Sequence, residues 1–543
     1  MVAGWRAWLG LAVALVVLNF ALSFHNLWPT PWITTRHELS VEFGLLVLCL
    51  ALASELGRPP SRRVLGLLAV LVLVFAVGRY LEVTAPALYG RRINLYWDVQ
   101  QLPNVAAMLI EAMPSWQAWL LAGALVMLIP LLYWAGLGLL TLLGNGLSYA
   151  VPRRFTMALA GILVLLYAAG RLHPAIGTLH WYSLPVSATY AQQLGFVYEV
   201  IADEDEPTST ATPFPRTSLA DLSGSDVVIL FCESYGATTL DRPDFDDALS
   251  KPRQALADAV AQTGRQAVSA RVRSPTFGGA SWLAHSTLLS GIEVSNNTQY
   301  QRLLTQDRDT LVHRFAEHGY RTVGVMPGLR KRWPEGAYYA YDTIYDADSL
   351  DYRGPDFGWW RIPDQFALAR FDALEVAPSA RPPLFAVINS ISSHAPFHPV
   401  PDYQSDWQVL LGPNSYTGLE PTAEDAEQGG LSGMDGHYVT AVAYLMKTVA
   451  GYLRLRAYHD MVLIVVGDHQ PPARISGPDA SWDVPVHVIA RDQALIAALE
   501  DEGFVTGLEP RSAAGPPMHE LAAVLLRAFA GTSKRTRVAH IDW

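Results

Sequence analysis

Apolar residues dominate the first third of the chain in long, nearly uninterrupted runs. Five runs are long enough, or nearly so, to span a bilayer core of about 30 Å. They cover residues 5–23, 40–56, 64–83, 116–142 and 155–171, and the second carries Glu42 and Glu55 near its ends. The pattern therefore predicts a transmembrane domain of five helices over residues 1–172.

Two stretches outside these runs are more polar. Residues 84–115 indicate either a helix lying on the outer membrane face or a loop packed on the bundle, because their aromatic and aliphatic residues are scattered among polar ones. Residues 173–216 are first aromatic, then acidic, then rich in Thr and Pro. That composition is typical of a juxtamembrane segment followed by a linker.

From residue 217 to residue 543, short apolar runs alternate with helical patterns. The runs at 226–232, 321–326, 384–391, 461–466 and 485–490 lack the polar alternation of a half-exposed strand. Helical periodicity follows at 309–318, 364–375, 437–456, 492–501 and 518–530. The pattern predicts an α/β domain whose mostly parallel central sheet is covered by helices on both faces.

Composition and charge narrow the class of protein. Hydrophobic residues make up 51% of the chain and charged residues 16%, which excludes intrinsic disorder. The 39 Lys and Arg against 50 Asp and Glu give a net charge of -11, so nucleic acid is not an expected partner. The two cysteines, Cys49 and Cys232, lie in unrelated apolar runs, which excludes a disulfide-stapled domain.

Positive charge near the helix ends predicts the orientation in the membrane. With the N-terminus in the cytoplasm, the cytoplasmic segments carry Arg6, Arg58, Arg62, Arg63, Arg153 and Arg154. The short outer loop carries only Arg36, and the longer outer loop offsets its two arginines with two acids. The bias favours an inside N-terminus. Five crossings then place residues 173–543 outside the cytoplasm.

Acidic and imidazole side chains follow two of the predicted strands. Glu233 comes directly after the strand at 226–232, and Asp468 and His469 follow the strand at 461–466. Sites in open parallel sheets form at the carboxyl ends of strands. These groups suit Zn²⁺ or Mn²⁺, although each acid alone is also typical of a helix start or a loop cap.

Two further segments carry candidate chemistry. Gly278-Gly279-Ala280-Ser281 precedes a predicted helix that runs to about Ser290, so Ser281 is either a helix cap or a hydroxyl beside free backbone N–H groups. His394 and His398 lie after the strand at 384–391, in a segment whose prolines favour a loop. Together the segments supply a nucleophile, two carboxylates and histidines at one edge of the sheet.

In this order, the motifs resemble the alkaline phosphatase superfamily in its sulfatase-like branch. The likeness is greatest to membrane-anchored lipoteichoic acid synthases, which are phosphoglycerol transferases, and to lipid A phosphoethanolamine transferases. The spacing from Ser281 to Leu288-Leu289-Ser290-Gly291 is similar to the sulfatase signature. The family also implies five membrane helices and an extracytoplasmic or periplasmic catalytic domain on the bacterial cytoplasmic membrane.

The resemblance implies roles for individual residues. Ser281 matches the nucleophile and completes a metal site with Glu233, Asp468 and His469. His394 matches a substrate-binding histidine, and Trp333 in Lys331-Arg332-Trp333-Pro334-Glu335 matches a tryptophan that contacts the head group.

Departures from the family pattern refine the expected chemistry. Leu283 and His285 replace the Pro and Arg that sulfatases need to modify their nucleophile, which favours phosphoryl chemistry with an unmodified serine. Ser390 stands where a second metal would need an acid, so one divalent metal, Mn²⁺ or Zn²⁺, is expected. The missing disulfides favour the phosphoglycerol branch.

The expected reaction moves a phospho-head group from a membrane phospholipid to a hydroxyl of a glycan or glycolipid, through phospho-Ser281. A hydrolase that uses the same site, and a non-catalytic lipid-sensing regulator on this scaffold, remain alternatives. His285 is included as a substrate-binding candidate, and the sequence assigns no role to His398, His437 or His487.

Overall fold

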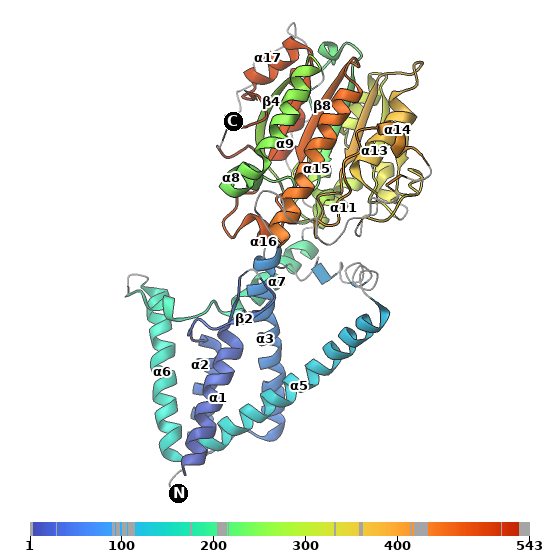
Figure 1. Ribbon diagram of the computed structural model, residues 1–543. Helices are drawn as coiled ribbons and strands as arrows, with labels where there is room; N and C mark the ends of the chain where they lie inside the picture. The colour runs from blue at the N-terminus through green and yellow to red at the C-terminus, as the bar shows by residue number, and fades with distance from the viewer. Residues whose placement is uncertain are drawn as a thin grey trace. The chain divides into compact units, whose positions relative to one another are not determined.

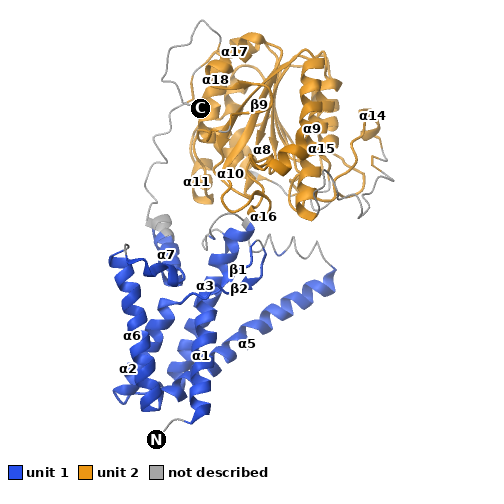
Figure 2. Cartoon of the chain, turned by 60° about the vertical axis from the view of Figure 1, so that its left-hand side comes forward, with its two compact units in different colours: residues 1–205 blue, residues 206–543 orange. Residues whose placement is uncertain are grey.

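The computed structural model describes two compact units, residues 1–205 and 206–543 (Figure 2). The described residues are 4–28, 30–89, 93, 98–99, 106, 114–173, 176–202, 214–215, 217–330, 333–357, 362–412, 415–416, 433–511 and 513–530. Most of the predicted interfacial stretch at 84–115 and most of the predicted linker lie outside this part of the chain. Residues 84–89 continue a helix that begins at Arg62.

The first unit contains a helix in each of the five predicted membrane runs (Figure 1). These are α1 (Trp5–Ser23), α2 (Val41–Glu55), α3 (Arg62–Tyr89), α5 (Ser115–Leu147) and α6 (Ala150–Leu172). In the described chain, four of them are long and apolar enough to cross a membrane. The fifth, α2, has 15 residues and is about 22 Å long.

Polar contacts tie one end of α2 to the start of α6 and the other end to α7 (Val186–Ala202). At one end, Glu55 accepts hydrogen bonds from Arg153 and Arg154 in the first turn of α6, at 2.5 and 3.0 Å. At the other end, Glu42 accepts from the backbone N–H of Ser187, which lies beyond the end of α6, at 3.1 Å. The short helix α2 packs against α6 and is held at its two ends by α6 and α7.

The remaining elements of the first unit are short. A two-stranded hairpin joins β1 (His25–Asn26) and β2 (Ile33–Thr34), and η2 (Thr178–Trp181) and α7 (Val186–Ala202) follow α6. Thr189 on α7 donates to Glu82 on α3 at 2.7 Å, and Glu82 also pairs with buried Arg79 at 3.0 Å. The Thr189–Glu82 hydrogen bond thus anchors α7 to α3.

The second unit is built on an eight-stranded sheet in the order β10-β4-β9-β8-β3-β7-β5-β6. Strands β8, β3, β7, β5 and β6 are parallel, whereas β9 is antiparallel to β8 and β4, and β10 is antiparallel to β4. The bounds are β3 (Asp226–Cys232), β4 (Gln266–Arg273), β5 (Arg321–Val325), β6 (Thr343–Tyr345), β7 (Leu384–Asn389), β8 (Met461–Gly467), β9 (Asp483–Ala490) and β10 (Val505–Thr506). The predicted, mostly parallel sheet is confirmed.

Two helical layers cover the sheet. One core joins Val228 and Leu230 to α9 (Pro243–Gln262), α13 (Asp364–Phe371) and α15 (Gly433–Leu455). The other joins Val227 and Ile229 to α10 (Ser281–Ser290), α12 (Leu311–Glu317), α17 (Gln493–Asp501) and α18 (Met518–Ala528). Successive residues of β3 face opposite cores, which explains why this strand has no polar alternation.

Shorter elements complete the unit. They are η3 (Ala220–Leu222), α8 (Thr238–Asp241), α11 (Asn297–Leu304), η4 (Pro334–Tyr339), the π-turn η5 (Asp372–Val376), α14 (Trp407–Leu410) and α16 (Ala473–Ser476). Sequence periodicity missed β4 and the 20-residue helix α9. In β4, Ser269 and Arg271 interrupt the apolar pattern although both are buried, and α9 contains Pro252.

Candidate active site

Glu233 follows β3 directly and is held by the segment after the neighbouring strand β7. The backbone N–H of Glu233 donates to Ser390 Oγ at 3.1 Å, and its carbonyl accepts from Ser393 Oγ at 2.6 Å. The next residue, Ser234, has a left-handed backbone with φ 56°. These bonds fix the buried carboxylate at the carboxyl edge of the sheet.

Asp468 and His469 follow β8, the other neighbour of β3. Gly467 is required at the end of this strand, because a Cβ there would lie 2.0 Å from the carbonyl oxygen of Tyr235. Asp468 Oδ1 accepts from the backbone N–H groups of Ser234 and His469, at 2.8 and 2.6 Å. The two strand ends are thereby joined through one carboxylate.

The orientation of the His469 ring follows from its backbone contact. Nδ1 lies 2.8 Å from the carbonyl oxygen of Gln470, and because a carbonyl only accepts, Nδ1 carries the proton. The other nitrogen, Nε2, lies 3.4 Å from Glu233 Oε1 and 3.7 Å from Asp468 Oδ2. A backbone carbonyl that accepts from one ring nitrogen commonly orients an imidazole whose other nitrogen binds a metal.

Ser281 is the first residue of α10, as the sequence predicts. Positive φ angles at Gly278, Gly279 and Ala280 turn the chain into the helix. The Ser281 hydroxyl does not cap the helix. It donates to Glu233 Oε2 at 2.9 Å and lies 3.2 Å from His469 Nε2.

Glu233, Asp468 and His469 offer three ligand atoms that lie within 4.8 Å of one another, all buried. Burial raises the pKa of Glu233, but the charges of His394 and His469 and a hydrogen bond from Ser281 hold it below its usual value. Burial and the charge of Glu233 raise the pKa of Asp468.

The imidazole of the cluster is also perturbed. Burial lowers the pKa of His469, but Asp468 and Glu233 outweigh that effect and raise it to about 9. The negative charge of the two carboxylates thus favours a positive charge between them. Without a metal ion, a protonated His469 provides that charge. Two carboxylate oxygens, one imidazole nitrogen and one hydroxyl form a donor set that fits a single divalent metal ion.

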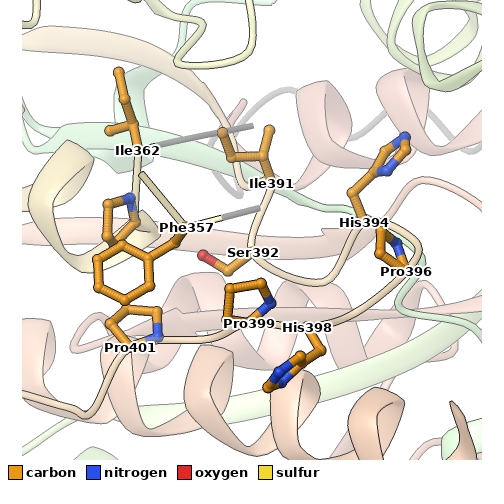
Figure 3. A pocket seen from close by; sticks show the side chains of 10 residues that line it. Phe357, Ile362, Ile391, Ser392, His394, Pro396, His398, Pro399 and Pro401 are labelled. Atoms are coloured by element: carbon orange, nitrogen blue, oxygen red, sulfur yellow. The ribbon is translucent and has the colours of Figure 1, made fainter. Parts of the chain in front are cut away.

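His394 lies on the loop between β7 and α14, beside a small pocket (Figure 3). Its Nδ1 donates to the carbonyl oxygen of Ala395 at 2.6 Å, and its charge acts on Glu233. The Phe357 ring and Pro401 form the pocket wall opposite His394 (Figure 3). The rest of the lining is Ile362, Pro363, Ile391, Ser392, Pro396, His398 and Pro399. An apolar cavity therefore adjoins the histidine predicted to bind substrate.

His285 lies one helical turn beyond Ser281 on α10. Its ring packs against Phe231 with 4.3 Å between ring centroids, and Nδ1 lies 3.3 Å from Asn389 Nδ2. Burial lowers its pKa to about 3, and the two charges that act on it are those of Glu233 and His469. The structure thus places a neutral histidine beside the cluster.

Trp333 lies apart from these contacts. Its ring stacks on Tyr339 with 5.7 Å between centroids, and the Tyr339 hydroxyl lies 2.9 Å from Ser286 Oγ on α10. Among the contacts recorded for the described residues, none joins Trp333 to Ser281, Glu233 or His469. Its role in head-group contact stays a prediction.

The other three histidines have separate surroundings. His398 and His437 stack with 4.6 Å between centroids and 18° between planes. His487 is buried in β9, where Nε2 lies 3.1 Å from the Tyr235 hydroxyl and Nδ1 lies 2.6 Å from Ser269 Oγ.

Sequence reasoning missed groups that support the cluster. Asp364 begins α13, and its carboxylate accepts from the backbone N–H groups of Ile391 and Ser392 at 2.7 and 3.2 Å, which holds the loop that carries His394. Burial raises the pKa of Asp364 to about 6. The signal that could have found Asn389 was its polar side chain at the carboxyl end of a buried strand.

Comparison with known protein families gives a match within the α/β unit. A family model described as Sulfatase matches residues 272–488. Comparison with curated protein sequences gives no match.

Several solved structures are similar to this chain at low identity. The lipoteichoic acid synthase LtaP from Listeria monocytogenes is 12% identical, covers 62% of this chain and 78% of its own, and has a TM-score of 0.36. The C-terminal periplasmic domain of EcEptC from Escherichia coli is 13% identical and has a TM-score of 0.37. The match covers 59% of this chain and 84% of that domain's chain. The phosphoglycerol transferase GacH from Streptococcus pyogenes, in complex with sn-glycerol-1-phosphate, is 12% identical and has a TM-score of 0.37. The match covers 63% of this chain and 80% of the GacH chain.

The family match spans Ser281, His394, Asp468 and His469, and it lies within the α/β unit whose sheet places them at one edge. The order of motifs predicts the same family. Residues 272–488 of this chain are therefore similar to the sulfatase family model.

Proposed function

We propose that the protein transfers a phospho-head group, phosphoglycerol or phosphoethanolamine, from a membrane phospholipid to a hydroxyl of a glycan or glycolipid. One observation carries the proposal. The Ser281 hydroxyl donates to Glu233 at 2.9 Å and lies 3.2 Å from His469 Nε2, inside a buried set of metal-ligand atoms. A hydroxyl in this setting is placed for nucleophilic attack.

In the first half of the reaction, Ser281 Oγ attacks the phosphorus of the phosphodiester. The new bond joins Oγ to phosphorus, and the bond from phosphorus to the diacylglycerol oxygen breaks. Glu233 orients Oγ through the hydrogen bond that it accepts, and it takes up the hydroxyl proton as the bond to phosphorus forms. A divalent ion, Mn²⁺ or Zn²⁺, held by Glu233, Asp468, His469 and Ser281, would lower the pKa of the hydroxyl and offset phosphate charge.

His394 is placed to serve the departing alcohol. It lines a small pocket, and it lies close enough to Glu233 for its charge to act there. We assign it the proton that the diacylglycerol oxygen needs as the bond to phosphorus breaks. In the second half, the acceptor hydroxyl attacks phosphorus and loses its proton to His394, the bond from phosphorus to Ser281 Oγ breaks, and Glu233 returns the proton to Oγ.

The membrane unit suits this chemistry because donor and product are lipids. The proposal places the N-terminus in the cytoplasm and the α/β unit outside it, on the bacterial cytoplasmic membrane, which requires an odd number of crossings. The packing of α2 against α6, and the bonds that hold its ends to α6 and α7, support α2 as the fifth crossing.

This topology can be tested with a single cysteine at Tyr458, which is 96% exposed. A membrane-impermeant maleimide should label Tyr458→Cys in intact cells, in a background whose native cysteines are replaced. Labelling only after the cells are broken would reverse the assigned side. A cysteine in the first turn of α1, at Arg6, serves as the opposite control.

The central experiment measures the mass of the peptide containing Ser281 after the full-length protein, in detergent micelles, meets donor lipid. We expect an added mass of phosphoglycerol or phosphoethanolamine, and none in Ser281→Ala. Ser286→Ala, which removes a hydroxyl from the same helix, should keep the adduct.

The alternatives give other results. An adduct whose head group passes only to water, whatever glycan or glycolipid is supplied, would make the protein a hydrolase. A protein without adduct and without bound metal would support the regulatory alternative and overturn the transferase.

A further inference from the structure

The side of the candidate site nearest β7 carries a pair of neutral polar residues that the proposed mechanism does not use. Asn389 is the last residue of β7 and lies in register with Phe231 on β3. Phe385 and Val387 belong to the core on the side of α10, so Asn389, two residues further along β7, faces the same helix. His285 on α10 packs on Phe231 and meets Asn389 there.

The orientation of the Asn389 amide follows from its two neighbours. Its Nδ2 lies 3.0 Å from Met326 Sδ and 3.3 Å from His285 Nδ1. A thioether sulfur can only accept, so the end of the amide that faces it is the N–H₂ donor. His285 Nδ1 then accepts, and the ring proton resides on Nε2.

This arrangement leaves two complementary groups. Asn389 Oδ1 is buried and has no hydrogen-bond partner in the described chain. His285 is half-buried, and its Nε2–H is a donor. A buried acceptor without a partner is costly, and such groups in native proteins are usually satisfied by a ligand or water.

The pair lies within reach of a group bound to Ser281. Residues four apart on a helix share one face and are separated by about 6 Å along the axis. Glu233 and His469, which contact the Ser281 hydroxyl, are also the charged groups that act on His285. A substituent two or three bonds beyond the phosphorus would therefore meet His285 and Asn389.

We propose that His285 and Asn389 bind a hydroxyl of the transferred head group, so that the donor carries a polyol such as glycerol and not an amine. A hydroxyl donates to Asn389 Oδ1 and accepts from His285 Nε2–H at once. An ammonium group only donates, so it leaves the histidine N–H without a partner. This inference rests on the proposed function and selects between its two head groups.

The test uses three lipids in detergent micelles with the full-length protein loaded with Mn²⁺. Phosphatidylglycerol supplies hydroxyls, phosphatidylethanolamine supplies an ammonium, and phosphatidylethanol supplies neither. The readout is kcat/KM for release of diacylglycerol. We expect phosphatidylglycerol to exceed each of the others by about 10-fold or more, since a site built for a hydroxyl strongly rejects analogues that lack it.

Two substitutions remove one partner each. Asn389→Leu removes the acceptor at similar volume, and His285→Leu removes the donor. Each should lower kcat/KM for phosphatidylglycerol by about 10-fold while changing the value for phosphatidylethanol by less than about 3-fold. His285→Gln, which can present an amide N–H, should recover part of the preference. Met326→Leu, which keeps both groups of the pair, should cost less than either.

The outcomes separate this inference from the proposed function. Preference for phosphatidylethanolamine with an intact Ser281 adduct overturns the inference and leaves the transferase standing. Equal losses for all three lipids in Asn389→Leu would make the residue structural and also overturn it. Absence of any adduct with every lipid overturns both.

Discussion

The four strands that lead into the candidate site contribute in two different ways. The ends of β3 and β8 supply charged side chains that are buried and joined by direct hydrogen bonds, such as Ser234 N–H to Asp468. The segments after β5 and β7 carry neutral or half-buried groups, such as Asn389, His394 and Trp333. These contact His285, the carbonyl oxygen of Ala395 and the ring of Tyr339, respectively. Under the proposed function, the first pair of strands serves the reaction at phosphorus, and the second carries the groups that would handle the departing alcohol and the head group.

The largest effect should come from removing a charge at β3 or β8. Asp468→Asn and Glu233→Gln should lose bound metal and lower the rate of transfer by roughly 10³-fold or more, because the nucleophile and phosphate lose their stabilising cation. Metal analysis of the purified protein and a diacylglycerol-release assay measure both. Ser281→Ala should lose the same activity but keep the two carboxylates and the imidazole, and therefore most of the metal.

Asp460→Asn is the matched control, because this exposed carboxylate precedes β8 at the opposite end of the strand and bonds Ser225. It should leave both metal content and rate near those of the parent protein. Full metal content in Asp468→Asn would contradict the assignment of Asp468 as a metal ligand. The metal site would then not lie at the ends of β3 and β8.

A smaller effect is expected at the β7 loop. His394→Gln should lower transfer from a natural phospholipid by about 10²-fold with metal retained, because the departing alcohol loses its proton donor. A donor whose leaving group is nitrophenol needs no such proton and should lose far less. Steady-state rates with both donors measure the difference.

His398→Ala provides the comparison within the same loop, since His398 lines the pocket but stacks on His437. It should show no difference between the two donors. Equal losses with both donors in His394→Gln would assign that residue to phosphate binding and not to proton transfer.

The charged half of the site could be predicted from sequence because each member has a simple local signature. Glu233 and Asp468 directly follow apolar strands, and Ser281 follows paired glycines at the start of a helix. In an open parallel sheet such positions converge on one edge whatever the intervening loops do. Strand register then brings Ser234 and Asp468 into contact.

The groups proposed to contact the head group, Asn389, His285 and Trp333, could not be predicted in the same way. Asn389 meets His285 only because β7 lies beside β3 and its odd-numbered side chains face α10, and neither fact is visible in a single sequence. The head-group role of Trp333 rests on resemblance alone and stays a prediction, and its stacking on Tyr339 is a tertiary contact that the sequence does not show. His487 lies in β9, whose antiparallel pairing with β4 places it against Ser269, and β4 itself escaped detection because it carries buried polar residues.

A modest effect on binding is expected at the end of β5. Trp333→Leu should raise KM about 3- to 10-fold with kcat unchanged, because a residue that only holds the head group contributes equally before and during reaction. The measurement is a donor titration in micelles of fixed surface composition. An unchanged KM with a lowered unfolding temperature would show that the Trp333 ring only supports Tyr339. Trp333 would then have no part in binding the head group.

The smallest effect concerns stability and the framework beneath β3. Burial lowers the pKa of His487 to about 3, with Arg253 adding to the shift, whereas an unfolded histidine titrates near 6.5. Between these values the unfolded chain binds a proton that the folded chain does not, so stability falls as pH falls from about 6.5. His487→Gln removes this contribution, and its unfolding free energy should depend less steeply on pH, by up to roughly 1 kcal/mol per pH unit. Unfolding of the α/β unit in micelles, followed from pH 7.5 to pH 5, measures the two slopes. Identical slopes would mean that His487 titrates in the folded protein much as it does in the unfolded chain, which would contradict the effect of its burial in β9.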